Sequence, residues 1–373
     1  MSDESKEFCC SVYIVFAILL LAVLIMIHEF GHFTAARIMK IDVTEFSVGF
    51  GPRLAGWKSR KYETKFSIRA IPLGGYCAFF GEDDAKGITK DDPRAFPNHN
   101  VWKRMFVILM GPMMNFVLAF VVSAVFFWCV GINVPVDDGI YPYIAEATEG
   151  GMAQSAGIRD DDIVKDINGR SMRTASLEEA VTAFQEAVQG WREGDEPLNM
   201  AIWRNGETIS VSVTPGWDES LQRMMVGVSL SAGKPTVRQP VGVAEGIREA
   251  WDVCVESAGT ILRLLRELPT NREVAENITG VVGTVAEVSY LTQRYGIEMY
   301  INLLVVISIN LGLMNLLPIP GLDGSRLVFH VIEVIRGKAI PQEKEAMVHL
   351  AGMVLLFGIM IFFTYKDIVR LIH

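Results

Sequence analysis

The sequence HEFGH occupies residues 28–32, directly after an apolar stretch of residues 8–27 that contains no Asp, Glu, Lys or Arg. Side chains four residues apart share one face of a helix, so His28 and His32 can present both imidazoles to one metal ion. Glu29 lies beside them and can hold a water molecule. This spacing is typical of zinc-dependent hydrolysis, and its location indicates chemistry in or beside a membrane.

The alternative for the two histidines is a structural role, because imidazoles can also pack or form hydrogen bonds within a helical bundle. The chain contains six His, so an HExxH arising by chance would be expected in about one in a hundred chains of this length. Ionisable residues at membrane depth are costly and usually serve a function. The context therefore favours a metal site.

Composition indicates a membrane protein, since half of the residues are hydrophobic, 21% are charged and the mean hydropathy is +0.30. Four segments without charged residues are long enough to span a bilayer, which takes about 20 residues: 8–27, 105–136, 299–322 and 346–365. The first is not a cleavable signal peptide, since its removal would separate the chain from its own HExxH. We expect four transmembrane helices, the first continuing through Met39.

The charges between the spans predict the orientation. Residues 35–104 contain 13 Lys and Arg against 8 Asp and Glu, whereas residues 137–298 contain 14 against 26. The positive-inside rule therefore predicts that residues 35–104 are cytoplasmic and that residues 137–298 and both termini lie outside. The formal net charge of −9 and the lack of a basic stripe argue against nucleic acid as a partner.

A catalytic zinc has three protein ligands and one open position, and a third candidate lies far from the first motif. The stretch NLLPIPGLDG, residues 315–324, closes the third apolar segment. Its two prolines and two glycines predict a break in the helix, with Asp323 facing the site from unwound backbone. The alternative, a plain turn at the cytoplasmic interface, is disfavoured once HEFGH occurs in the same chain.

These two motifs together resemble the site-2 protease family of intramembrane zinc metalloproteases, most closely its bacterial regulator-of-sigma-E protease branch. GFGP at residues 49–52, IPLGGY at 71–76 and GPMMN at 111–115 are similar to that branch as well. The resemblance covers nearly the whole chain. It implies His28, His32 and Asp323 as Zn²⁺ ligands, Glu29 as general base and acid, and Asn315 as a group contacting the substrate backbone or the oxyanion.

Residues 62–76 predict a strand that leads into a turn at Gly74 and Gly75, within a cytoplasmic, membrane-associated β segment of residues 43–80. The family resemblance implies that this segment could hold the substrate as an added strand. A plain cytoplasmic hairpin is the alternative.

A soluble module is predicted between the second and third spans. Strands at 141–147, 201–203 and 208–214, a helix at 176–188, and Asn-Gly turns at 168–169 and 205–206 resemble a PDZ domain. Relatives often carry two such domains, whereas this chain has room for one. Such a domain could bind peptides or act as a steric gate. Residues 241–268 predict amphipathic helices that lie on the outer membrane surface or pack against the PDZ domain.

The predicted architecture is thus a polytopic α-helical membrane protein with one inserted extracytoplasmic PDZ domain. Its regions are residues 1–136 with two spans, the HExxH and the β segment; the PDZ domain at 137–230; extracytoplasmic amphipathic helices at 231–298; and residues 299–373 with two spans and the LDG motif.

The favoured function is an intramembrane zinc endopeptidase of a bacterial inner membrane, with its active site toward the cytoplasm. Expected partners are membrane lipid, single-span substrates such as anti-sigma factors or signal-peptide remnants, and a site-1 type protease that makes the first cut. A catalytically silent PDZ-bearing scaffold is disfavoured because all four site residues are intact. A zinc transporter is disfavoured because the chain supplies one closed-end site and an external peptide-binding module.

Overall fold

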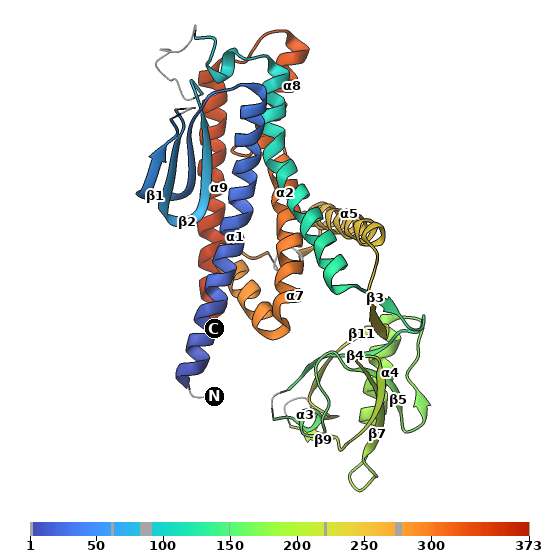
Figure 1. The fold of residues 1–373 in the computed structure, drawn as a ribbon. Helices are drawn as coiled ribbons and strands as arrows, with labels where there is room; N and C mark the ends of the chain where they lie inside the picture. Colours follow the sequence, from blue (N-terminus) through green and yellow to red (C-terminus); the bar gives the residue numbers. More distant parts are fainter. Residues whose placement is uncertain are drawn as a thin grey trace. The chain divides into compact units, whose positions relative to one another are not determined.

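The computed structural model describes residues 3–60, 63–82, 92–148, 150–219, 222–272 and 278–372. The chain divides into two compact units, whose elements are labelled in Figure 1. The membrane unit comprises Met1–Trp128 and Gly242–His373, and the inserted unit comprises Cys129–Val241. The inserted unit thus extends beyond the predicted PDZ range of 137–230 at both ends.

Four long helices run alongside one another in the membrane unit (Figure 1): α1 (Asp3–Met39), α2 (Val101–Val130), α7 (Val281–Leu316) and α9 (Gln342–Ile372). Each is long and apolar enough to cross a membrane, which confirms the four predicted spans. Buried Ala17, Leu20 and Leu24 of α1 pack against Val288 of α7. The other faces of these helices expose many large apolar side chains, as expected where the surrounding solvent is lipid.

Two of the uncharged segments continue beyond the ends of their helices. The second helix ends at Val130 rather than at 136, because Gly131 adopts a φ of 90° and strand β3 (Ile132–Pro135) begins directly after it. The third ends at Leu316, within the stretch where a break was predicted, because Pro318 and Pro320 cannot continue a helix. The lack of charged residues identifies both segments, whereas Gly131 and the two prolines determine where the helices end.

Two amphipathic helices also belong to the described part of the membrane unit. Helix α5 (Val243–Glu267) packs Val253, Cys254, Ala258 and Ile261 against a cluster that includes residues of α2 and α7. Helix α5 thus belongs to the membrane unit and rests on α2 and α7, whereas the sequence left open whether it lies on the outer membrane surface or against the PDZ domain. Helix α8 (Asp323–Arg336) follows the Pro-rich loop and carries Asp323 in its first turn.

The β segment consists of two long strands, β1 (Val43–Lys58) and β2 (Lys65–Phe79), connected through residues that include the undescribed positions 61 and 62. Both strands double back on themselves: Val48 of β1 lies opposite both Ile68 and Gly75 of β2, and Ile68 lies opposite both Val48 and Ala55 of β1. The chain reversal predicted near Gly74 and Gly75 is present: β2 doubles back between Ile68 and Gly75, which both lie opposite Val48 of β1, and Gly74 has a φ of 139°. Glycine permits this tight reversal, because Gly74 adopts a φ that residues with a side chain rarely reach.

The inserted unit is built around one sheet with strand order β11-β4-β5-β7-β8 and the short β6 paired with β5. Its strands are β4 (Tyr141–Ala147), β5 (Ile163–Ile167), β6 (Arg170–Ser171), β7 (Leu198–Arg204), β8 (Glu207–Val213) and β11 (Val228–Gly233). Two further pairs are formed by β9 (Gly216–Asp218) with β10 (Arg223–Met225) and by β3 with β12 (Thr236–Gln239). The helices are α3 (Met152–Ser155) and α4 (Leu177–Gln189).

The strands and turns predicted for this unit are present. Asn168 and Gly169, and likewise Asn205 and Gly206, have positive φ values, as the tight turns between paired strands require. A single core joins the sheet to α4, with Ile144, Val164, Met172, Phe184, Met200 and Ile202 at most 2% exposed. The unit therefore has its own hydrophobic interior.

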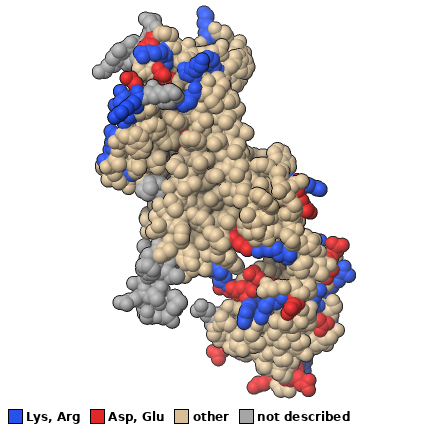
Figure 2. Space-filling model, viewed as in Figure 1, with Lys and Arg blue, Asp and Glu red and all other residues tan. Residues whose placement is uncertain are grey.

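Charged side chains are unevenly distributed over the membrane unit. Figure 2 shows Lys and Arg gathered on the visible face near β1 and β2, whereas the long middle part of the unit is free of charges on that face. This pattern agrees with a belt of helices in lipid and a charged end in water.

The buried ion pair of the inserted unit provides a test of its fold. Asp162 is fully buried. Its carboxylate accepts two hydrogen bonds from the Arg204 guanidinium, at 2.7 and 2.6 Å, and one from the main-chain amide of Arg159 at 2.8 Å. Asp162→Asn leaves Arg204 without its counter-ion, so we expect a loss of about 2–4 kcal/mol in the free energy of unfolding. Chemical denaturation of a fragment comprising residues 129–241 measures it.

The matched control is Asp138→Asn, because the side chain of Asp138 is 95% exposed and its ion pair with Lys234 is long, at 3.8 Å. Exposed pairs contribute about 0–1 kcal/mol. Equal stability changes in the two variants would contradict the central role given to Asp162.

Candidate metal centre

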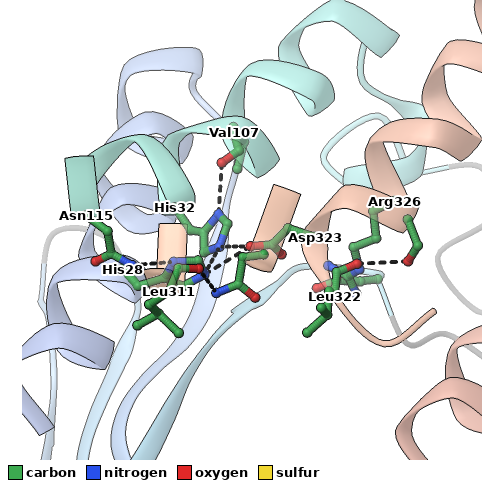
Figure 3. A network of polar contacts seen from close by, with 11 residues as sticks. His28, His32, Val107, Asn115, Leu311, Leu322, Asp323 and Arg326 are labelled. Carbon is green, nitrogen blue, oxygen red and sulfur yellow. Dashed lines mark hydrogen bonds and ion pairs between the residues drawn. The ribbon is translucent and has the colours of Figure 1, made fainter. Parts of the chain in front are cut away.

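Three polar atoms converge inside the membrane unit (Figure 3). His28 Nε2 lies 3.0 Å and His32 Nε2 lies 3.2 Å from Oδ2 of Asp323, and the two imidazole nitrogens are 3.3 Å apart. Both histidines are at most 6% exposed, and the Asp323 side chain is 16% exposed. Helix periodicity brings the histidines together, whereas Asp323 arrives from the distant helix α8.

This triangle of donors fits a zinc ion. Zn–N and Zn–O bonds of about 2.0–2.1 Å at tetrahedral angles separate neighbouring ligand atoms by about 3.3 Å, close to the observed spacings. Apart from the two imidazoles, the buried Oδ2 of Asp323 has no hydrogen-bond partner among the described residues. Two imidazoles with one carboxylate are also a ligand set typical of catalytic zinc.

The charge of Asp323 is favoured by its surroundings. Burial acts to raise the pKa of this carboxyl group, but His32 and His28 outweigh burial and hold the pKa well below its usual range. Asp323 is therefore a carboxylate, the form in which it can bind a metal.

Glycines allow α1 and α2 to approach closely at the centre. A Cβ atom on Gly31 would lie 2.2 Å from the carbonyl oxygen of Met110, and one on Gly111 would lie 2.2 Å from Nε2 of His32. Small residues at such crossings are the usual means of close helix packing in membranes. The approach places the Val107 carbonyl 2.9 Å from Nδ1 of His32, so that nitrogen donates and Nε2 remains free to bind metal.

The loop between α7 and α8 positions Asp323. Helix α7 ends at Leu316, and Leu322 caps the start of α8, so Asp323 lies in the first helical turn rather than in unwound backbone as predicted. A Cβ atom on Gly324 would lie 2.2 Å from the Leu317 carbonyl oxygen. The glycine after Asp323 therefore lets α8 begin directly against the end of α7.

Glu29 lies between the donor triangle and the β segment. A Cβ atom on Gly75 of β2 would come within 3.3 Å of the Glu29 side chain, and the backbone of Cys77 hydrogen-bonds to the Glu29 carboxylate. The segment predicted to contact substrate thus lies directly beside the predicted general base. Gly74, by contrast, faces Phe50.

A cavity of about 800 Å³ opens onto the centre. His28, Glu29, His32 and Asp323 line it together with Gly75, Asn315 and residues of α8 and α9. The Asn315 amide donates to the Leu311 carbonyl at 3.0 Å (Figure 3). All predicted site residues except Gly74 therefore border one cavity.

A second layer of ionic contacts surrounds this cavity. Arg326 of α8 pairs with Glu82 at 2.6 Å, and buried Arg104 of α2 pairs with Glu333 of α8. Burial and then the charge of Arg104 lower the pKa of His330 to about 4, so this cavity-lining imidazole is neutral at physiological pH. These contacts fix α8, and hence Asp323, against α2 and the β segment.

Several residues of the site were not predicted individually. They are Asn115, which contacts His28; the carbonyl of Val107; the spacer Gly111; and the Cys77 backbone. Asn115 and Gly111 lie in GPMMN, the motif that resembled the protease branch, and an amide within an apolar span was itself a signal. Backbone contacts such as those of Val107 and Cys77 leave no mark in side-chain chemistry.

Comparison with known proteins agrees with this chemistry. The chain matches Peptidase family M50 over residues 16–359. It is 34% identical to a proposed zinc metalloprotease of Clostridium acetobutylicum, covering 95% of this chain and 97% of that protein. It is 33% identical to a proposed zinc metalloprotease of Agrobacterium fabrum, with 96% of each covered, and 28% identical to the regulator of sigma-W protease RasP of Bacillus subtilis, with 95% and 97% covered.

The match extends over nearly all of the chain and includes both segments that supply the converging donors. The names of the first two relatives describe them as zinc metalloproteases. The chain is therefore a zinc metalloprotease that belongs to peptidase family M50, the site-2 protease family of membrane proteases.

Proposed function

We propose that this chain is an intramembrane endopeptidase that cleaves the transmembrane segments of single-span proteins, with zinc held by His28, His32 and Asp323. The observation that carries the proposal is the convergence of these three donors beside Glu29, on a cavity of about 800 Å³ and at the level of the spanning helices. Substrates would be anti-sigma factors or signal-peptide remnants, already cut outside the membrane by a site-1 type protease.

Each residue at the centre has a distinct task. A bound zinc ion would supply Lewis-acid polarisation and lower the pKa of a water molecule to about 7. Glu29 accepts the proton of the attacking water and passes it to the leaving amine. Asn315, which borders the same cavity, turns a free N–H of its amide toward the oxygen that becomes negatively charged.

The substrate must be extended before it can be attacked. A helix engages its own carbonyl groups in hydrogen bonds, so a spanning segment has to unwind locally. Strand β2 passes beside Glu29 at Gly75 and Cys77, and addition of the unwound segment to this strand would hold it in reach of the base. Gly75 leaves the space that the substrate backbone needs.

The first test is cleavage of a tagged single-span substrate that lacks its external domain, in membranes carrying the wild type or Glu29→Gln. The substitution keeps the size of the side chain and the three donors but removes the base. We expect cleavage to fall on the order of a hundredfold or more, measured as the rate at which the cleaved product appears.

The matched control is Glu345→Gln, since Glu345 of α9 borders the same cavity but is assigned no part in the reaction. Its rate should remain within a few-fold of the wild type. Equal cleavage by wild type and Glu29→Gln would support the alternative, a catalytically silent membrane scaffold that acts through its inserted unit.

We assign the inserted unit as a PDZ domain on the external side. Strand β11 forms an edge of the main sheet next to α4, and a small cavity of about 50 Å³ lies between them, lined by Phe184 and Val188 of α4 and by residues 223–228. An exposed strand edge beside a helix suits peptide addition. A steric gate that rejects substrates with intact external domains would use the bulk of the same unit.

Removal of this unit tests the gate. Strands β3 and β12 pair, and the Val136 amide donates to the Pro235 carbonyl at 2.8 Å, so an Asn-Gly turn replacing residues 137–234 can connect the two strands as a tight hairpin. We expect the shortened protein to cleave full-length substrate at a rate approaching that for the pre-cut form. Unchanged discrimination between the two substrates would count against a gate.

We place the protein in a bacterial inner membrane, with the β segment and active site facing the cytoplasm. The exposed apolar side chains Val243, Ile247 and Trp251 of α5 suit contact with the outer lipid surface. Nucleic acid is not an expected partner.

Single cysteines introduced into a cysteine-free chain test the orientation. Lys58→Cys on β1 should react with a membrane-impermeant maleimide only after the membrane is permeabilised, whereas Asp138→Cys should react in spheroplasts without permeabilisation. Both side chains are more than half exposed, so accessibility within the protein does not limit labelling. The reverse pattern would overturn the orientation.

A further inference from the structure

The two zinc-site histidines have different second partners. Nδ1 of His32 lies against the main-chain carbonyl of Val107, whereas Nδ1 of His28 lies 3.3 Å from the side-chain amide of Asn115. Asn115 is on α2, two helical turns beyond Val107 along the same helix. Substitution of Asn115 can therefore remove the contact to His28, whereas the contact to His32 comes from the main chain and does not depend on a side chain.

Asn115 is held rigidly. It is fully buried, and its carbonyl oxygen accepts a hydrogen bond from the Ser308 hydroxyl of α7 at 2.8 Å. Its side-chain Oδ1 is buried and has no hydrogen-bond partner among the described residues. An amide at membrane depth without a partner for its oxygen is costly, which indicates that the oxygen has a role.

The chemistry of metal binding determines which end of the amide faces His28. If Nε2 of His28 binds zinc, the proton of the neutral ring must be on Nδ1, which then requires an acceptor. The amide nitrogen cannot accept a hydrogen bond, whereas Oδ1 can. A half-turn of the amide about its terminal bond exchanges the two ends and brings Oδ1 against Nδ1–H.

We propose that Asn115 is a positioning residue of the metal centre, accepting the Nδ1–H of His28 through Oδ1 and so fixing the tautomer and ring orientation that leave Nε2 free for zinc. This inference rests on the assignment of His28, His32 and Asp323 as ligands. Partners of this kind typically change metal affinity by about 10–100-fold when they are lost.

Two substitutions of nearly equal size separate the acceptor role from packing. Asn115→Leu fills the same space but accepts no hydrogen bond, whereas Asn115→Asp keeps an acceptor and gives up the donor. Both are made in the full-length chain carrying Glu29→Gln, which we expect to suppress turnover. Zinc affinity is measured by competition with a chelating dye, and the site is examined through the visible absorption of bound Co²⁺.

We expect Asn115→Leu to weaken zinc binding about 10–100-fold and to alter the Co²⁺ spectrum. Asn115→Asp should bind zinc at least as tightly as the parent, because a carboxylate is a stronger acceptor for the imidazole. The control is Ser123→Ala, a buried polar residue of α2 away from the donors, which should bind zinc like the parent.

Three outcomes would overturn the role of Asn115: parent-like binding by Asn115→Leu, loss of binding in Asn115→Asp, or a loss in Ser123→Ala equal to that in Asn115→Leu. If Asn115→Leu does not fold, Asn115→Asp decides alone, because an amide that only donates to His28 would lose its contact in this variant. Parent-like zinc binding by His28→Ala would instead overturn the ligand assignment, and with it this inference.

Discussion

The membrane unit depends on one constraint, which is that lipid offers no hydrogen-bond partner to a polar group. His28, His32, Asn115 and Asp323 would each be costly alone at this depth. They are tolerated because three helices bring them into one cluster in which they contact one another and the Val107 carbonyl. The cluster can form only because Gly31 and Gly111 have no side chain, so that Gly31 of α1 lies against the Met110 carbonyl and Gly111 of α2 lies against the His32 ring.

The same constraint explains how the parts around the centre are arranged. Asp323 has to reach the histidines without bringing unsatisfied backbone into lipid, and the short Pro-rich loop achieves this by ending α7 and starting α8 within a few residues. Pairing of Arg326 with Glu82 and of Arg104 with Glu333 then fixes α8 from two sides. The placement of Asp323 thus depends on ion pairs among residues that line the cavity.

Much of this architecture could be predicted from the sequence, because its signals are local. Uncharged stretches marked the four helices, and the spacing of His28 and His32 on one helix face marked the metal site. Asn-Gly pairs marked tight turns in the inserted unit. The features that were not predicted have a common cause: the pairing of β3 with β12, the placement of Gly75 beside Glu29, and the partner of His28 depend on contacts between distant segments. A sequence pattern within one segment does not show which distant segment it will contact.

The donor triangle has a consequence for the synthesis of the protein. Its histidines lie on α1, whereas Asp323 follows α7 near the other end of the chain. A chain is synthesised from its N-terminus onward and folds one unit at a time. The inserted unit can therefore form before Asp323 has been synthesised. The complete set of proposed zinc ligands therefore exists only once α8 has been synthesised and docked. With Asp323 as the third ligand, the order of the segments by itself would keep an unfinished copy from acting as a protease.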